Sequence, residues 1–145
     1  MKAIITFLVF VSVYTTGTNL KPISKPTADD ILGEWLTAHK DGHVLIYKKD
    51  KKYYGKIIWG VGYPEKDVKN QDPKLRTRDL IGLNILSDFV YDGDNAWEDG
   101  TIYLPGAGKS YSCVLTLKSV DALKVRGYVG STLFGKTEYW TRIKK

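Results

Sequence analysis

The chain has 145 residues, a formal net charge of +6 and a single cysteine, Cys113. This length predicts one domain, and the lone cysteine excludes an intramolecular disulfide. A basic protein can bind nucleic acid or anionic surfaces. An exported chain meets little nucleic acid, however, so the export signal described next argues against a nucleic-acid partner.

The N-terminus has the pattern of a secretory signal peptide. Lys2 precedes an uncharged apolar run at residues 3–13, and small residues follow at 15–17. The run is too short to span a bilayer, which needs about 20 residues. We therefore favour a signal peptide at residues 1–17 and a tether at residues 18–28 over a buried strand or a retained anchor. No cysteine follows the run to carry a lipid, so we expect a periplasmic or secreted protein with no stable membrane anchor.

From residue 29 onward, short β-rich segments alternate with turn-forming residues, and no long stretch has a helical period. The predicted strands are residues 31–38, 43–48, 53–60, 84–91, 96–104, 109–118, 122–130 and 135–143. Eight strands joined mostly by tight turns predict an all-β fold, an up-and-down antiparallel barrel over residues 29–145. The interior of such a barrel holds side chains or one small ligand.

One connection, residues 61–83, is far longer than a hairpin needs. Long loops in compact domains are often lids or binding loops, so we expect this segment to cover a pocket. Asp72 followed by Pro73 is a good start for a short helix over residues 73–78.

Arg76 and Arg78 are the most informative charges of this connection. Two arginines on a lid could clamp a carboxylate or phosphate head group. The alternative, which we favour, is that they pair with Asp72, Asp79 or a carboxylate of the barrel rim and fix the loop, because structural ion pairs are common.

Gly33 and Trp35 form a Gly-x-Trp motif at the start of the first predicted strand. In an eight-stranded meander this motif resembles the entry motif of the calycin superfamily, the lipocalins and fatty-acid-binding proteins. The resemblance implies that the tryptophan plugs the closed end of the barrel under an arginine of the last strand. Arg142, which shares a face with Trp140, is the candidate, with Arg126 as the second choice.

Further strings extend the resemblance over residues 29–143: D-I-L-G-E-W, Y-Y-G-K-I-I-W, D-P-K-L-R-T-R-D-L-I-G-L-N-I-L, W-E-D-G-T-I-Y, G-K-S-Y-S-C-V-L-T-L, L-K-V-R-G-Y-V-G and F-G-K-T-E-Y-W-T-R. In this order they resemble the family called domain of unknown function 2147, small exported bacterial proteins with a calycin-like barrel. The resemblance implies a fold and an export route but no reaction.

The chain departs from that family at three positions. Tyr54 stands where many members carry a cysteine, so any pairing with Cys113 is lost. Asp79 replaces a proline, which we expect to loosen the long connection, and Leu104 replaces an acidic residue.

Other motifs have simpler interpretations. Residues 106–110, G-A-G-K-S, resemble the end of a phosphate-binding loop but lack its first glycine and precede a strand, which indicates a hairpin turn. Residues 92–95, D-G-D-N, resemble a calcium loop without its later ligands, which also indicates a turn. His39 and His43, even with Asp41 nearby, make a weak metal site. We expect surface histidines and no bound metal.

No arrangement of a nucleophile, acid and base can be assembled from the sequence, and the alternation around Cys113 predicts a buried, inert thiol. We therefore predict a lipocalin-like protein, not an enzyme and without a cofactor, that binds a small apolar or amphipathic ligand as a monomer or weak dimer. The alternative is a ligand-free barrel that serves as an interaction module for another envelope protein.

The predicted ligand-binding residues are the two loop arginines and aromatic residues of the barrel. They are Trp59, Arg76, Arg78, Tyr103, Tyr111 and Tyr128, and the predicted structural residues are Gly33, Trp35, Trp140 and Arg142.

Overall fold

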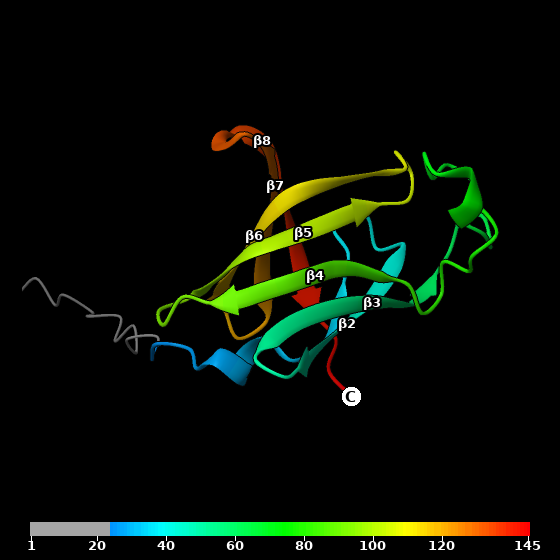
Figure 1. Cartoon of the computed structure of the whole chain (residues 1–145). Helices are drawn as coiled ribbons and strands as arrows, with labels where there is room; N and C mark the ends of the chain where they lie inside the picture. The colour runs from blue at the N-terminus through cyan, green and yellow to red at the C-terminus, as the bar shows by residue number, and fades with distance from the viewer. Residues whose placement is uncertain (1–23) are drawn as a thin grey trace, which may run out of the picture.

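An eight-stranded antiparallel barrel forms the body of the protein in the computed structural model, which describes residues 24–145 (Figure 1). Its strands are β1 (Gly33–Leu36), β2 (Gly42–Lys49), β3 (Lys52–Gly60), β4 (Asn84–Tyr91), β5 (Ala96–Leu104), β6 (Lys109–Ser119), β7 (Ala122–Val129) and β8 (Ser131–Arg142). Each strand pairs with the next and β8 pairs with β1, so the predicted up-and-down barrel is confirmed. The expected signal peptide and residues 18–23 of the expected tether lie outside the described residues.

Alternating apolar side chains fill much of the barrel interior. On β6, Cys113, Leu115 and Leu117 point inward and are buried, and on β7 Leu123 and Val125 are buried on the same side. Both strands thus alternate with a period of two, because successive side chains of a strand point to opposite sides of the sheet.

The closed end of the barrel is built around Trp35, whose side chain is fully buried. Its indole Nε1 donates to the Ile31 carbonyl oxygen at 2.9 Å. The Arg142 guanidinium lies over the indole ring, 4.3 Å from its centroid, and donates to the carbonyl oxygens of Leu32 and Asp30. The contact expected between Trp35 and Arg142 is therefore present, and such a cation–π contact stabilises by about 0.5–2 kcal/mol.

Arg126, the second choice for this contact, lies elsewhere. Its guanidinium donates to the Thr132 carbonyl oxygen at 2.7 Å and to Thr137 Oγ1 at 2.8 Å, and so fixes the connection between β7 and β8.

Gly33 is required at the closed end for two reasons. Its φ of 122° disfavours other residues, and a Cβ there would lie 3.2 Å from Arg142 Nη1.

The first strand begins at Gly33 rather than at residue 31, because the preceding residues form a 3₁₀ helix, η1 (Ala28–Ile31), across the end of the barrel. The Trp97 indole donates to the Ala28 carbonyl oxygen at 3.1 Å, and the Tyr53 hydroxyl donates to Asp29 at 2.6 Å. Tertiary contacts thus decide the form of this segment.

Within residues 24–145, no helix has the length and apolar character needed to cross a membrane.

The last strand is longer than predicted, and much of it has a partner on one side alone. β8 begins at Ser131 rather than at residue 135, and residues 132–134 form a bulge opposite the end of β7. β1 pairs with β8 at Arg142 and Thr141 alone. The seam between β1 and β8 is therefore short, and the first part of β8 forms an unpaired edge beside the barrel interior.

We predict that Arg142→Met lowers the free energy of unfolding by about 2–4 kcal/mol. The substitution removes the cation–π contact and the charge-assisted hydrogen bonds to backbone carbonyls. Urea unfolding followed by tryptophan fluorescence measures the change. Lys124→Met, on the outer face of β7, is the matched control and should cost less than about 1 kcal/mol. Equal losses in the two variants would contradict a special role for Arg142.

Candidate functional site

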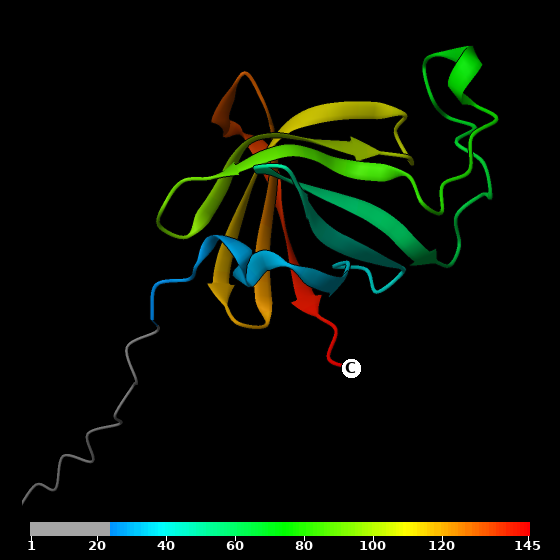
Figure 2. The same ribbon diagram turned by 60° about the horizontal axis from the view of Figure 1, so that its bottom comes forward.

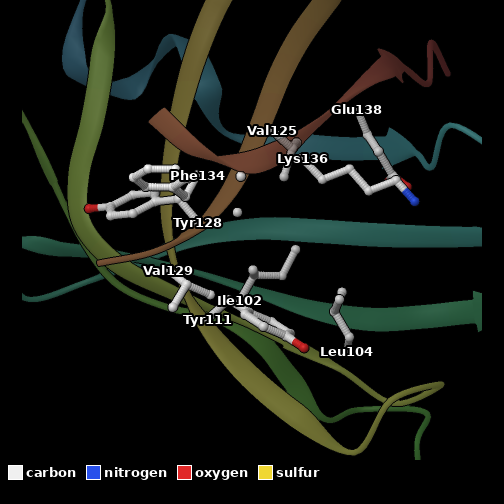
Figure 3. Close-up of a pocket in the computed structure, with 11 residues that line it drawn as sticks. Ile102, Leu104, Tyr111, Val125, Tyr128, Val129, Phe134, Lys136 and Glu138 are labelled. Atoms are coloured by element: carbon white, nitrogen blue, oxygen red, sulfur yellow. The ribbon is translucent and has the colours of Figure 1, made fainter. Parts of the chain in front are cut away.

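The barrel is hollow at the end away from η1. A pocket of about 330 Å³ lies between β5, β6, β7 and β8 (Figure 3). Its lining residues are Ile102, Leu104, Tyr111, Val125, Gly127, Tyr128, Val129, Phe134, Gly135, Lys136 and Glu138. The volume falls at the lower end of the range of about 300–1,000 Å³ that is typical of small-molecule sites.

Apolar side chains line most of this pocket. Val125 and Ile102 are 3% and 6% exposed and form its floor, whereas Leu104 and Phe134 are 41% and 73% exposed and stand at its entrance. Leu104 is one of the positions at which the sequence departs from the resembling family. An apolar side chain there extends the apolar lining to the rim.

Two charged side chains, Lys136 and Glu138, project from β8 into the same pocket (Figure 3). Glu138 Oε1 lies 3.6 Å from His39 Nε2, and the Trp140 indole Nε1 lies 3.5 Å from Glu138 Oε2. The pocket thus has apolar walls on β5, β6 and β7 and one charged wall on β8.

The predicted aromatic ligand residues divide into two groups. Tyr111 and Tyr128 line the pocket. Trp59 and Tyr103 do not, because their side chains lie outside the barrel. Trp59 packs on the ring of His43 with the centroids 4.5 Å apart, and Tyr103 is covered by the long connection.

A buried polar cluster holds that connection, residues 61–83, against the outside of β5. The Asp67 carboxylate accepts hydrogen bonds from the Tyr103 hydroxyl at 2.5 Å, from Asn70 Nδ2 at 2.9 Å and from Arg78 Nε at 2.9 Å. The Arg78 guanidinium also lies over the Tyr103 ring, 5.4 Å from its centroid. Arg78 therefore positions the loop.

The same cluster shifts the ionisation of its members. Burial by itself raises the pKa of the Asp67 carboxyl, but the hydrogen bonds from Tyr103, Asn70 and Arg78, together with the Arg78 charge, outweigh it. The pKa of Asp67 is therefore below its ordinary value. Burial and the Asp67 carboxylate raise the pKa of the Tyr103 hydroxyl. At neutral pH the cluster is thus a carboxylate surrounded by donors.

Further contacts within the connection involve the other residues that the sequence singled out. Arg76 Nε donates to the Asn70 carbonyl oxygen at 2.7 Å. Asp72 caps the 3₁₀ helix η2 (Pro73–Leu75), the short form of the expected helix, by accepting from a backbone amide at 2.9 Å. Asp79 forms an ion pair and an isolated bridge with Lys66. Asp79 therefore joins the two arms of the loop, where the sequence had suggested loosening.

Arg78 and Tyr103 line a separate open groove outside the barrel, so the head-group contact expected of the two arginines stays a prediction. The connection does not cover the interior pocket, however, and is not its lid. None of residues 61–83, all of which the structure describes, lines the pocket. Figure 2 shows the segment, in green, standing beside the barrel. It packs so closely on the β5–β6 turn that a Cβ on Gly108 would overlap the Lys69 carbonyl. The alternative interpretation, that Arg76 and Arg78 fix the loop, matches their contacts, but the partners are Asp67 and a backbone carbonyl instead of Asp72, Asp79 or a carboxylate of the barrel rim.

The turn-like motifs are turns. Residues 105–108 connect β5 to β6, as expected for the glycine-rich string. In the D-G-D-N string, Asp92 accepts hydrogen bonds from the backbone amides of Asp94 and Ala96 at 2.8 and 3.1 Å. Backbone amides, the largest influence, hold the pKa of Asp92 below its usual range.

The candidates for metal and thiol chemistry are not among the residues that line the pocket. In residues 24–145, no group of three or more His, Cys, Asp and Glu side chains is arranged to hold a metal ion. Cys113 is fully buried, and burial raises the pKa of its thiol to about 12. A protonated, buried thiol is a poor nucleophile, as the sequence predicted.

The residues that the sequence interpretation missed are the charged ones of β8. Lys136 and Glu138 share the period-two face of Trp140 and Arg142, the arginine that the calycin resemblance places over the tryptophan plug. Extending that alternation toward the start of the strand would have placed both charges inside the barrel. Asp67 gave no comparable signal, because its partners come from a loop and a distant strand.

Comparisons with known proteins agree with this architecture. Residues 33–142 match the family described as "Uncharacterized protein conserved in bacteria (DUF2147)". Among solved structures, protein HP1028 from Helicobacter pylori, described as belonging to the lipocalin family, is 27% identical with a TM-score of 0.72. The match covers 79% of this chain and 83% of HP1028. A comparison with curated proteins gives no match.

We predict that Asp67→Asn lowers the free energy of unfolding at pH 7 by about 2–3 kcal/mol. The substitution removes the negative charge of the buried Asp67 carboxylate, whose partner is the partly exposed Arg78 guanidinium. Since the pKa of Asp67 is lowered by folding, its contribution is present above the unfolded pKa of about 4 and is lost as pH falls below that value. The difference in the free energy of unfolding between wild type and variant should therefore shrink as the pH falls below that value.

Urea unfolding at a series of pH values measures this difference. Asp79→Asn is the matched control, because the ion pair of Asp79 with Lys66 is exposed and should contribute less than about 1 kcal/mol. A difference for Asp67→Asn that stayed constant from pH 7 to pH 3 would contradict the role of its charge.

Proposed function

The chain belongs to the DUF2147 family and has a lipocalin-like barrel, and we propose that it binds a small amphipathic molecule inside that barrel. The observation that carries the proposal is the interior pocket of about 330 Å³, whose apolar floor and walls end in two charged side chains. Pockets of this composition are typical of ligand sites, because apolar walls provide affinity and a few polar groups orient the ligand.

We propose binding rather than catalysis. The polar side chains of the pocket are one lysine, one glutamate and two tyrosines, with no serine, cysteine or histidine in the lining. Such a set supports holding a polar head group. The signal-peptide pattern of residues 1–17 supports a periplasmic or extracellular place for this binding.

A second candidate function is protein–protein interaction through β8. The first part of this strand has β7 as its one strand partner, and it carries Leu133 and Phe134, which are 83% and 73% exposed. An unpaired strand edge with exposed apolar side chains can accept a strand from another chain. Cross-linking of the exported protein in cells would identify such a partner.

We predict that Gly127→Leu abolishes ligand binding while the fold is kept. A Cβ at Gly127 would meet Ile102 Cγ2 at 3.5 Å, an ordinary contact, so the backbone accepts a side chain that then fills the pocket. Ser112→Leu is the matched control, because it adds the same side chain on the outer face of β6. Titration with the neutral dye N-phenyl-1-naphthylamine, whose fluorescence rises in apolar sites, measures binding.

Unchanged dye binding in Gly127→Leu would place the site elsewhere. A wild-type protein that takes up neither the dye nor any molecule from a lipid extract, as judged by native mass spectrometry, would favour the interaction module.

A further inference from the structure

The charged wall of the pocket carries two opposite charges on one face of β8. Lys136 and Glu138 are two residues apart on β8, so their side chains leave the same face of the strand about 6.8 Å apart. Gly127 and Val125 stand opposite them on β7. On the adjacent strand the two charges therefore have a glycine and a valine as neighbours, neither of which offers a polar side chain.

The two charges do not form a direct ion pair with each other. Among residues 24–145, no carboxylate oxygen lies within 4.0 Å of the Lys136 ammonium. The Glu138 carboxylate has two other contacts, with the His39 imidazole at 3.6 Å and with the Trp140 indole at 3.5 Å. Lys136 is exposed and Glu138 is half-buried, and each gains a charge-assisted hydrogen bond from a ligand group of opposite charge.

We propose that the ligand is a dipolar amphiphile, with an anionic group against Lys136, an ammonium group against Glu138 and an apolar tail across the pocket. This inference rests on the proposed function and names its substrate class. A head group with one charge would satisfy one of the two side chains and repel the other. A head group with both charges, as in an α-amino acid with a long apolar side chain, satisfies both.

The shape of the pocket fits this orientation. The head group lies along β8, and the tail extends toward Ile102, Leu104 and Tyr111 on β5 and β6 (Figure 3). Phe134 stands at the entrance, so the ligand enters beside the unpaired edge of β8.

The test uses four ligands with the same eight-carbon chain: octan-1-ol, octanoate, octylammonium and the dipolar 2-aminooctanoate. Isothermal titration calorimetry with the full mature protein gives each affinity, and displacement of N-phenyl-1-naphthylamine confirms the site. We expect 2-aminooctanoate to bind at least about fivefold more tightly than each of the others, the size expected for one partly exposed ion pair.

Two variants separate the charges. Lys136→Met should remove the advantage of 2-aminooctanoate over octylammonium, and Glu138→Gln should remove its advantage over octanoate. Lys124→Met and Glu98→Gln, which carry the same changes on the outer surface, are the matched controls and should leave all four affinities unchanged. Binding of the neutral dye shows that each variant keeps its pocket.

The outcomes are distinguishable. If the dye and octan-1-ol bind but 2-aminooctanoate has no advantage, or if the two pocket variants behave like their controls, the dipolar ligand is wrong and the proposed function stands. A tighter binding of octanoate alone, or of octylammonium alone, would replace it with a singly charged ligand. If neither the dye nor any of the four ligands binds, the proposed function fails, and this inference fails with it.

Discussion

The contact between the Arg142 guanidinium and the Trp35 indole is the interaction on which the rest of the barrel depends. It joins the first strand, the last strand and η1 at one end, because the same guanidinium also binds backbone carbonyls just before β1. One large aromatic side chain closes that end, and the open space inside the barrel lies at the other end. The position of the pocket thus follows from the position of the plug.

The short seam between β1 and β8 is the second feature that shapes the site. Because β1 ends at Leu36, the first part of β8 has no neighbour on that side, and Lys136 and Glu138 sit on a strand that is packed from one side alone. Charged side chains are tolerated there because water reaches them. The same incomplete closure provides an entrance to the apolar floor formed by Val125 and Ile102.

The long connection shows how a correct observation about the sequence can suggest a lid that the fold does not form. Its length and its arginines suggested a lid with a clamp for a head group. In the fold, the Arg78 guanidinium donates a hydrogen bond to the Asp67 carboxylate, and Arg76 donates to a backbone carbonyl within the loop. A buried carboxylate must be paired, and Arg78 meets that need. Nothing in the local sequence distinguishes an arginine that faces a ligand from one that faces a carboxylate far along the chain.

The sequence by itself determined the strands, their order and the faces they present, because these follow from local properties: the alternation of side chains with period two and the turn residues between strands. It also indicated the plug, because Gly33, Trp35 and Arg142 match the motif of the calycin superfamily that the sequence resembles. Only the tertiary structure decided that Ala28–Ile31 forms a helix, that residues 61–83 pack outside the barrel, and where the interior stays open. The physical reason is that burial, hydrogen-bond partners and empty volume are set by residues that meet in space after closure.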